Sequence, residues 1–405
     1  MKSKLALLLI STLLALYGVE VGLGLIDRTP DRIEVARSQG IEFDPRTPLE
    51  VVRDLRAQGS EAFALLSPAE FLPAGVALSD GNALPLAGIS NVTTVWCNES
   101  GDYLVYAADR HGFNNPQSAW AEDVEILLLG DSFAQGACCV SGSDVGSLLR
   151  SRGYRVRNLG MGGSGPLLSL AVLREYVEPR AAPRVFWLYF EGNDLLNLKS
   201  ERQSQVLMRY LEDPEYSQGL RGRQGELDAF MKRYFDEHSQ RSSGNEPAAW
   251  RQWIVPRVKL THLRSRLSLL RTNVPEDTVG LLRRVLEQAR ARVTREGGEL
   301  VFVYLPAYSR YLSQPASQAD RDPLYRDPRY RDPRYRDPLY RDQVLALVRD
   351  LGIPMVDFHQ ALSETDEPKR FFPLGLAGHY NPSGYRLLAE QLEQYVAADA
   401  ATELR

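Results

Sequence analysis

The sequence predicts an α/β protein whose parallel sheet is covered by helices on both faces. The first observation is a set of short, continuously apolar segments, which are typical of strands buried on both faces. The second is that segments with helical spacing separate these strands, as in βαβ units. The third is that polar turns containing glycine follow the segments at 124–130, 154–158 and 184–190. Together they favour an open sheet with its functional loops along one rim.

The elements of this core can be placed in order from the same patterns. The expected strands are 124–130, 154–158, 184–190, 297–306 and 353–357. The expected helices are 142–152, 167–176, 341–351 and 382–396. We therefore predict a core domain over residues 123–396, preceded by a stalk and pre-core segment at 27–122 and followed by a tail at 397–405.

Two segments are extra material within this core. Residues 195–297 are charged and have mostly helical spacing, so we interpret them as a helical insertion. Residues 322–341 hold four pentads of the form Asp-Pro-(Leu or Arg)-Tyr-Arg, and a proline in every unit excludes a regular helix. We interpret this tract as an extended loop; a ligand-binding arm for an acidic polymer is the alternative. The net charge of −4 argues against a nucleic-acid binder.

The first 26 residues predict export. Lys2 and Lys4 precede an apolar run that approaches the ~20 residues of a membrane helix. Positive charge on the amino side predicts an N-terminal transmembrane signal anchor over residues 1–26 with its start in the cytoplasm. The expected location is the inner membrane, single-pass, with the enzyme domain on the periplasmic or extracytoplasmic side. A cleaved signal peptide is the alternative.

Cysteine usage is consistent with export. The chain has three cysteines, and in an oxidising compartment we expect a bridge from Cys97 to Cys138 or Cys139. The last two are adjacent and rarely bridge each other, because that geometry is strained. The alternative is three reduced, buried thiols. Neither a Cys-x-x-Cys motif nor a pair of histidines with ligand spacing occurs, so we expect no metal and no cofactor.

The stretch that bears the chemistry is Gly130-Asp131-Ser132, directly after the first expected strand. Ligands bind beyond the carboxyl ends of parallel strands, so Ser132 is well placed for catalysis. The stretch is not a Gly-x-Ser-x-Gly nucleophile elbow, because Ala134 occupies the second glycine position. Taken alone it is more typical of a simple turn at the end of a strand. Its significance depends on partners further along the chain.

A serine nucleophile needs a base and oxyanion donors, and the sequence offers both. Of the five histidines, His379 lies in a glycine-containing loop just before the closing helix, a usual place for a catalytic residue. The other four are His111, His238, His262 and His359. The glycine-rich loop 160–165 offers backbone N–H groups, and Asn193 offers a side-chain amide after the third strand.

These four pieces, in this order, resemble the motifs of the SGNH (GDSL-type) esterases and acyltransferases. The matching stretches are residues 130–132, 158–163, 192–194 and 378–382. The resemblance implies a three-layer, flavodoxin-like core with Ser132 as nucleophile and His379 as base. It implies oxyanion donors at Gly163, with Gly160 as the alternative, and at Asn193. In layout the chain resembles membrane-anchored bacterial members found with exopolysaccharide and cell-envelope genes.

The chain departs from this family at the triad acid. The family's aspartate precedes the histidine by two or three residues, where this chain has Leu376 and Ala377. Three explanations are open. A backbone carbonyl near Leu376 orients His379 in a dyad; a carboxylate from elsewhere substitutes; or hydrolysis has been lost. The substitutes considered are Asp357, Asp366 and Glu367.

The leading hypothesis is an exported, membrane-tethered esterase or O-acyltransferase. Its partners would be the membrane, through the N-terminal helix, and an acylated polysaccharide or other ester, with O-acetyl groups as the expected target. The alternative is a catalytically inactive carbohydrate-binding or assembly factor of the same fold. A third reading is a metal phosphoesterase using Asp131, Asp194 and His379. The sequence leaves the acyl group, the acceptor and the oligomeric state open.

Overall fold

The computed structural model describes most of the chain. The described residues are 2–26, 31–79, 81–120, 124–177, 184–244, 277–311 and 338–403, together with Leu260 and Leu263. The pentad tract falls largely outside this set, and its last residues, from Pro338, begin helix α13 (Pro338–Asp350).

A five-stranded sheet forms the centre of the molecule, and all its strand pairs are parallel. Its strands are β6 (Ile126–Gly130), β7 (Val156–Asn158), β8 (Arg184–Phe190), β9 (Glu299–Leu305) and β10 (Met355–Asp357). The spatial order is β10-β9-β8-β6-β7, so the chain crosses to one side of β6 and later returns to the other. In sheets with such a reversal, ligands bind in the crevice outside the carboxyl ends of the two strands that flank it, which here are β6 and β8. The predicted α/β class with a parallel sheet is confirmed.

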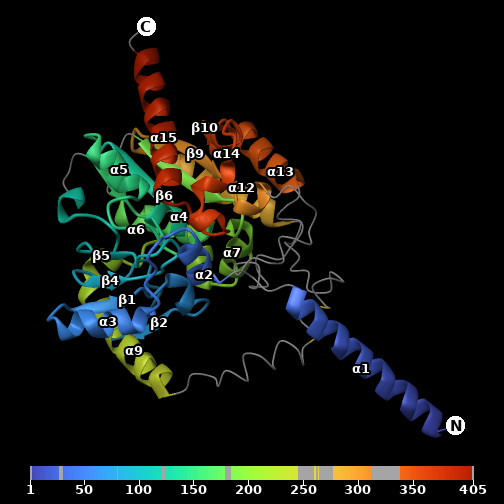
Figure 1. The fold of residues 1–405 in the computed structure, drawn as a ribbon. Helices are drawn as coiled ribbons and strands as arrows, with labels where there is room; N and C mark the ends of the chain where they lie inside the picture. The colour runs from blue at the N-terminus through green and yellow to red at the C-terminus, as the bar shows by residue number, and fades with distance from the viewer. Residues whose placement is uncertain are drawn as a thin grey trace.

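Helices cover both faces because alternate strand residues point in opposite directions. Leu127 and Leu129 of β6 belong to the core on one face, whereas Ile126 and Leu128 belong to the core on the other. The first face is covered by α6 (Pro166–Tyr176), α7 (Asp194–Glu201), α8 (Gln205–Glu212), α12 (Asp277–Arg295) and α13. The second is covered by α4 (Ser132–Gln135), α5 (Val145–Ser151), α14 (Phe358–Ser363) and α15 (Pro382–Glu403) (Figure 1). Helix α15 therefore continues into the segment that the sequence analysis assigns to a tail.

The segment before the core contains a second, small sheet. Its strands are β1 (Ala62–Ala64), β4 (Thr93–Val95) and β5 (Val105–Ala107). A separate two-stranded hairpin, β2 (Val76–Leu78) and β3 (Gly81–Ala83), lies between β1 and β4 in the chain. Helices α2 (Arg32–Ser38) and α3 (Pro48–Ala57) precede the small sheet, and α3 packs on β1. Buried residues of this segment belong to the same apolar cluster as the first face of the central sheet. Strands of three residues are too short to show an alternating pattern, so sequence periodicity does not reveal them.

The N-terminal segment forms one helix, α1 (Lys2–Ile26), which points away from the other elements in Figure 1. The sequence analysis predicts a membrane anchor here, and the structure does not support it: none of the described helices is both long and apolar enough to cross a membrane. The predicted helical insertion contains most of α7 and all of α8, α9 (Gln224–Gly244) and α12 within its described parts.

Candidate active site

The end of β6 presents Ser132 at the crevice. Gly130 has a φ of +147°, and a Cβ there would lie 2.6 Å from the Leu188 carbonyl oxygen, so this sharp exit from the sheet requires glycine. The Asp131 carboxylate accepts a hydrogen bond from the Phe133 N–H at 2.9 Å and caps α4. Ser132 is the first residue of that helix and is 6% exposed.

His379 reaches Ser132 from the loop that precedes α15. Its Nε2 lies 2.9 Å from the Ser132 Oγ, although the two residues are 247 positions apart in the chain. The imidazole packs near Phe133, with ring centroids 4.8 Å apart, and near Trp96 at 6.3 Å. The structure therefore brings the predicted nucleophile and base into direct hydrogen-bond contact.

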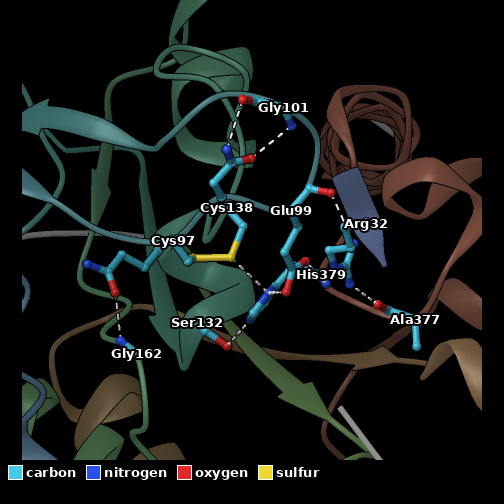
Figure 2. The surroundings of a disulfide bond; sticks show 11 residues. Arg32, Cys97, Glu99, Gly101, Ser132, Cys138, Gly162, Ala377 and His379 are labelled. Carbon is cyan, nitrogen blue, oxygen red and sulfur yellow. Dashed lines mark hydrogen bonds and ion pairs between the residues drawn. A yellow bond between two sulfur atoms is a disulfide. The ribbon is translucent and has the colours of Figure 1, made fainter. Parts of the chain in front are cut away.

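A carboxylate from the pre-core segment completes this chain of contacts. Glu99 Oε1 lies 3.2 Å from His379 Nδ1, and Glu99 Oε2 accepts the His379 backbone N–H at 2.8 Å (Figure 2). The carboxylate therefore contacts both the ring and the main chain of His379. Serine, histidine and glutamate stand in the order of a hydrolase triad.

The surroundings keep this carboxylate charged. Burial opposes ionisation of Glu99, but the charges of His379 and Arg32 and the hydrogen bonds from His379 outweigh it, so its pKa lies below the usual range. Two other buried acids, Asp131 and Asp194, have raised rather than lowered pKa values. Burial raises the pKa of Asp131, and burial together with the Asp131 charge raises the pKa of Asp194 well above the usual range. Glu99 is thus the carboxylate suited to stabilise a cationic imidazole.

Two groups besides the N–H of the nucleophile itself are available to stabilise an oxyanion. In the glycine-rich loop, the Gly160 N–H donates to Asn158 Oδ1 at 2.9 Å and the Gly162 N–H to Gln135 Oε1 at 2.6 Å. The Gly163 N–H has no acceptor among the residues that the structure describes, so the loop geometry favours Gly163 over Gly160. The Asn193 amide, 8% exposed, donates to Asp131 Oδ2 at 3.1 Å and so adjoins Ser132.

The match to known proteins agrees with this arrangement. A family model described as GDSL-like lipase/acylhydrolase matches residues 128–387, which is well over half of the chain. The chain belongs to the GDSL-like lipase/acylhydrolase family. The resemblance drawn from the four sequence motifs is therefore confirmed. A comparison with curated proteins finds no match.

Solved structures of this family are only distantly similar. A GDSL-like lipase from Bacteroides thetaiotaomicron is 10% identical, and the match covers 70% of this chain and 94% of that one with a TM-score of 0.38. A lipase/acylhydrolase from Enterococcus faecalis is 14% identical, with 68% and 96% covered and a TM-score of 0.34. Similarity at this level does not bear on the substrate of this chain.

The candidate triad acid differs from every substitute that the sequence analysis considers. Asp357 instead pairs with Arg341 and caps α14. Among the described contacts of His379, none involves Asp366, Glu367 or the Leu376 carbonyl. Sequence reasoning missed Glu99 because it looked near the histidine, as the family pattern suggests. The available signal was the cysteine pairing, since Glu99 follows Cys97 by two residues.

Several contacts hold the Glu99 loop beside the catalytic elements. The structure pairs Cys97 with Cys138, the first of the two bridges left open by the sequence, and Cys139 is a buried free thiol. Arg32 of α2 donates to the Glu99 carbonyl oxygen at 3.0 Å and also to the Ala377 carbonyl oxygen. Figure 2 shows these contacts converging around His379. The acid loop and the histidine loop are therefore joined to each other and to the loop after α4.

The other predicted candidates lie outside the triad. His111 packs against Trp120, His238 contacts the Tyr234 carbonyl oxygen, and His359 contacts Tyr311. His262 lies outside the described residues. The set proposed for a metal phosphoesterase, Asp131 with Asp194 and His379, is not among the metal-ligand groups found in the described part of the chain.

A buried glutamate accepts backbone hydrogen bonds at the end of the glycine-rich loop. Glu201 of α7 accepts the Gly165 N–H at 2.5 Å and the Leu167 N–H at 2.9 Å, at the start of α6. Burial raises the pKa of Glu201 to about 7, although these backbone donors act in the opposite direction. The carboxyl group is therefore expected to gain a proton near neutral pH while the protein remains folded.

This raised pKa predicts a pH-dependent stability. The folded state holds the Glu201 proton up to about pH 7, whereas the unfolded chain releases it near ~4.3. By linkage, the free energy of unfolding contributed by this group falls as pH rises through that window, by up to about 4 kcal/mol. Urea unfolding at pH 5 and pH 8 should show a smaller decline for Glu201→Gln than for the wild type. The exposed Glu212→Gln serves as control, and parallel declines in all three proteins would contradict the prediction.

Proposed function

We propose that this chain is a serine esterase or O-acyltransferase with Ser132 as nucleophile, His379 as base and Glu99 as triad acid. The observation that carries the proposal is the continuous hydrogen-bond chain from Ser132 Oγ through His379 to Glu99. A nucleophile bonded to a base, with the base oriented by a third group, is the arrangement that activates a serine. The alternative, an inactive binding factor, was suggested by the lack of the family's aspartate near His379. The contacts of Glu99 with His379 favour the active enzyme instead.

The geometry supports the following mechanism. Glu99 accepts the Nδ1 proton of His379, so Nε2 is free to take the Ser132 proton as Oγ attacks the ester carbonyl. The N–H groups of Ser132 and Gly163 and the amide of Asn193 would hold the resulting oxyanion. His379 then gives its proton to the departing alcohol. Water or a sugar hydroxyl attacks the acyl-serine and releases the acyl group, which makes the reaction a hydrolysis or a transfer.

We propose a short acyl group, with acetyl as the expected one. Ser132 is 6% exposed and lies among tightly packed groups. Phe133, the next residue, stacks on Phe190 with ring centroids 4.0 Å apart and also contacts the His379 ring. Trp96 lies against Gly162 so closely that a Cβ there would overlap its ring. This packing favours a small substituent next to the serine over a long aliphatic chain.

We also propose that the enzyme works outside the cytoplasm on an O-acetylated polysaccharide of the envelope or of a secreted polymer. The disulfide supports this location, because such bonds persist in oxidising compartments and are rare in the cytosol. Cell fractionation with thiol-reactive labelling checks the location. The protein should be found in the extracytoplasmic fraction with the Cys97–Cys138 pair oxidised. Protein found in the cytosolic fraction with this pair reduced would contradict the proposed location.

Labelling with a fluorophosphonate, followed by an ester panel, tests the activity. The wild type should be labelled at Ser132, and Ser132→Ala should not. Among p-nitrophenyl esters, kcat/KM should be at least ~10-fold higher for acetate than for octanoate, since a close-packed site discriminates by ~1–3 kcal/mol per misfitted group. Release of acetate from an acetylated polysaccharide then tests the substrate class. A folded, unlabelled wild type would contradict the esterase, and a preference for octanoate would contradict the short acyl group.

A further inference from the structure

The disulfide lies directly against the imidazole, on the side away from Ser132. The Cys138 sulfur is 3.4 Å from His379 Nδ1, and Glu99 Oε1 is 3.2 Å from the same nitrogen. Ligand atoms of these three residues all lie within 4.8 Å of one another. The Cys97 sulfur is bonded to that of Cys138 but does not belong to this group of ligand atoms (Figure 2). Three residues with typical zinc-ligand groups thus meet at Nδ1 of the histidine ring.

The spacing of these atoms suits one tetrahedral ion. Zinc binds imidazole nitrogen and carboxylate oxygen at ~2.0–2.2 Å and thiolate at ~2.3 Å, so neighbouring ligands lie roughly 3.3–3.7 Å apart. The separations of Nδ1 from the Cys138 sulfur and from Glu99 Oε1, 3.4 and 3.2 Å, are close to that range. While the disulfide is intact, neither sulfur is a thiolate. Only Glu99 and His379 are then available, which is too few ligands for a tight site.

We propose that reduction of the Cys97–Cys138 bond creates a zinc site from Cys138, Glu99 and His379, with water as the fourth ligand, and that the bound ion switches the serine off. The reductant is a phosphine or a dithiol. With a phosphine and water, phosphorus is oxidised to the phosphine oxide, the S–S bond takes up two electrons, and water supplies the two protons of the thiols. Binding of Zn²⁺ then releases the Cys138 proton as that sulfur becomes a thiolate.

Loss of activity follows from which nitrogen the ion occupies. With zinc on Nδ1, the remaining ring proton lies on Nε2, the atom that faces Ser132 at 2.9 Å. A nitrogen that carries a proton cannot accept one from Ser132, so general-base catalysis stops. The ion also engages Glu99, which no longer orients the ring. Before Cys97 and Cys138 are oxidised, the enzyme would therefore be held inactive by zinc.

The zinc site does not depend on the proposed function, whereas inhibition by zinc does. The experiment therefore measures zinc binding and inhibition separately. The full chain is reduced with a water-soluble phosphine, freed of reductant by gel filtration without oxygen, and titrated with Co²⁺ and then Zn²⁺. The reduced protein should take up one ion per chain, with the thiolate-to-cobalt absorption band that Zn²⁺ abolishes. The oxidised protein should show neither. Zinc should also raise the unfolding temperature of the reduced protein but not that of the oxidised protein.

Matched variants assign the ligands. Cys139→Ser, which removes the buried thiol outside the proposed site, should bind like the wild type. Cys138→Ser and His379→Ala should each weaken binding by at least ~10-fold, since the loss of one ligand costs more than the 10–100-fold typical of an outer-shell partner. A cobalt spectrum that is unchanged in Cys138→Ser but lost in Cys139→Ser would overturn the assignment. Loss of the far-ultraviolet circular dichroism signal on reduction would also overturn the proposal, because the site requires the native fold.

The activity measurement uses p-nitrophenyl acetate as substrate. Reduced, metal-free protein should keep measurable esterase activity, and one equivalent of Zn²⁺ should lower it by at least ~10²-fold, because a histidine with its proton on the wrong nitrogen loses ~10⁴-fold. A chelator should restore the activity. Zinc binding without inhibition would overturn the switch while leaving the site in place. Absence of activity in every form would instead count against the proposed function, and the cobalt titration would still decide the site.

Discussion

Glu99→Gln should lower kcat for p-nitrophenyl acetate by about 10³–10⁴-fold and change KM little. A glutamine amide can donate to His379 Nδ1, which favours the tautomer with its proton on Nε2 and blocks acceptance of the Ser132 proton. In a Ser-His-Asp triad, the equivalent loss of the acid's charge costs ~10⁴ in kcat. Steady-state kinetics of the purified variant at neutral pH give the measurement.

The matched control for this prediction is Asp102→Asn, three residues further along the same loop. Asp102 is exposed, so neutralising it should leave kcat within about 2-fold of the wild type. A Glu99→Gln enzyme that keeps wild-type kcat would show that Glu99 is structural. The histidine would then have to act as part of a dyad.

Ser132→Ala should reduce esterase turnover by about 10⁴–10⁶-fold, because the acyl-enzyme can no longer form. Combining it with Glu99→Gln should cause almost no further loss, since residues that act as one unit are strongly non-additive. Ser151→Ala, at the exposed end of α5, is the control and should retain full activity. Independent, multiplicative losses in the double variant would mean that Glu99 does not act through Ser132.

The central sheet could be predicted from the sequence because its longer strands are apolar and its strands alternate with helical segments. Strands buried on both faces show as continuous apolar runs, and β6, β8 and β9 were predicted from that pattern. The edge strands β7 and β10 have three residues each, and their places follow from the βαβ alternation. The small sheet at β1, β4 and β5 could not be predicted, because its three-residue strands carry too little periodicity and no βαβ alternation marks them.

The residues of the candidate site likewise differ in whether the sequence could predict them. Ser132 and His379 lie in local motifs that are visible in the sequence, and the fold brings them to 2.9 Å. Glu99 lies in no motif. Its position depends on the Cys97–Cys138 bond and on the Arg32 contact, which join parts of the chain far apart in sequence. Local patterns report local structure, so a catalytic group supplied by a long-range tether becomes visible only in three dimensions.

The central claim is that Glu99 orients His379 for Ser132, and the proton between Glu99 and His379 tests it most directly. We would record proton NMR spectra of the oxidised protein with ¹⁵N-labelled histidine. The account predicts a strongly deshielded His379 Nδ1 proton in the wild type, in Ser132→Ala and in Asp102→Asn, and its loss in Glu99→Gln. The same resonance persisting unchanged in Glu99→Gln, or absent from the wild type, would contradict the account.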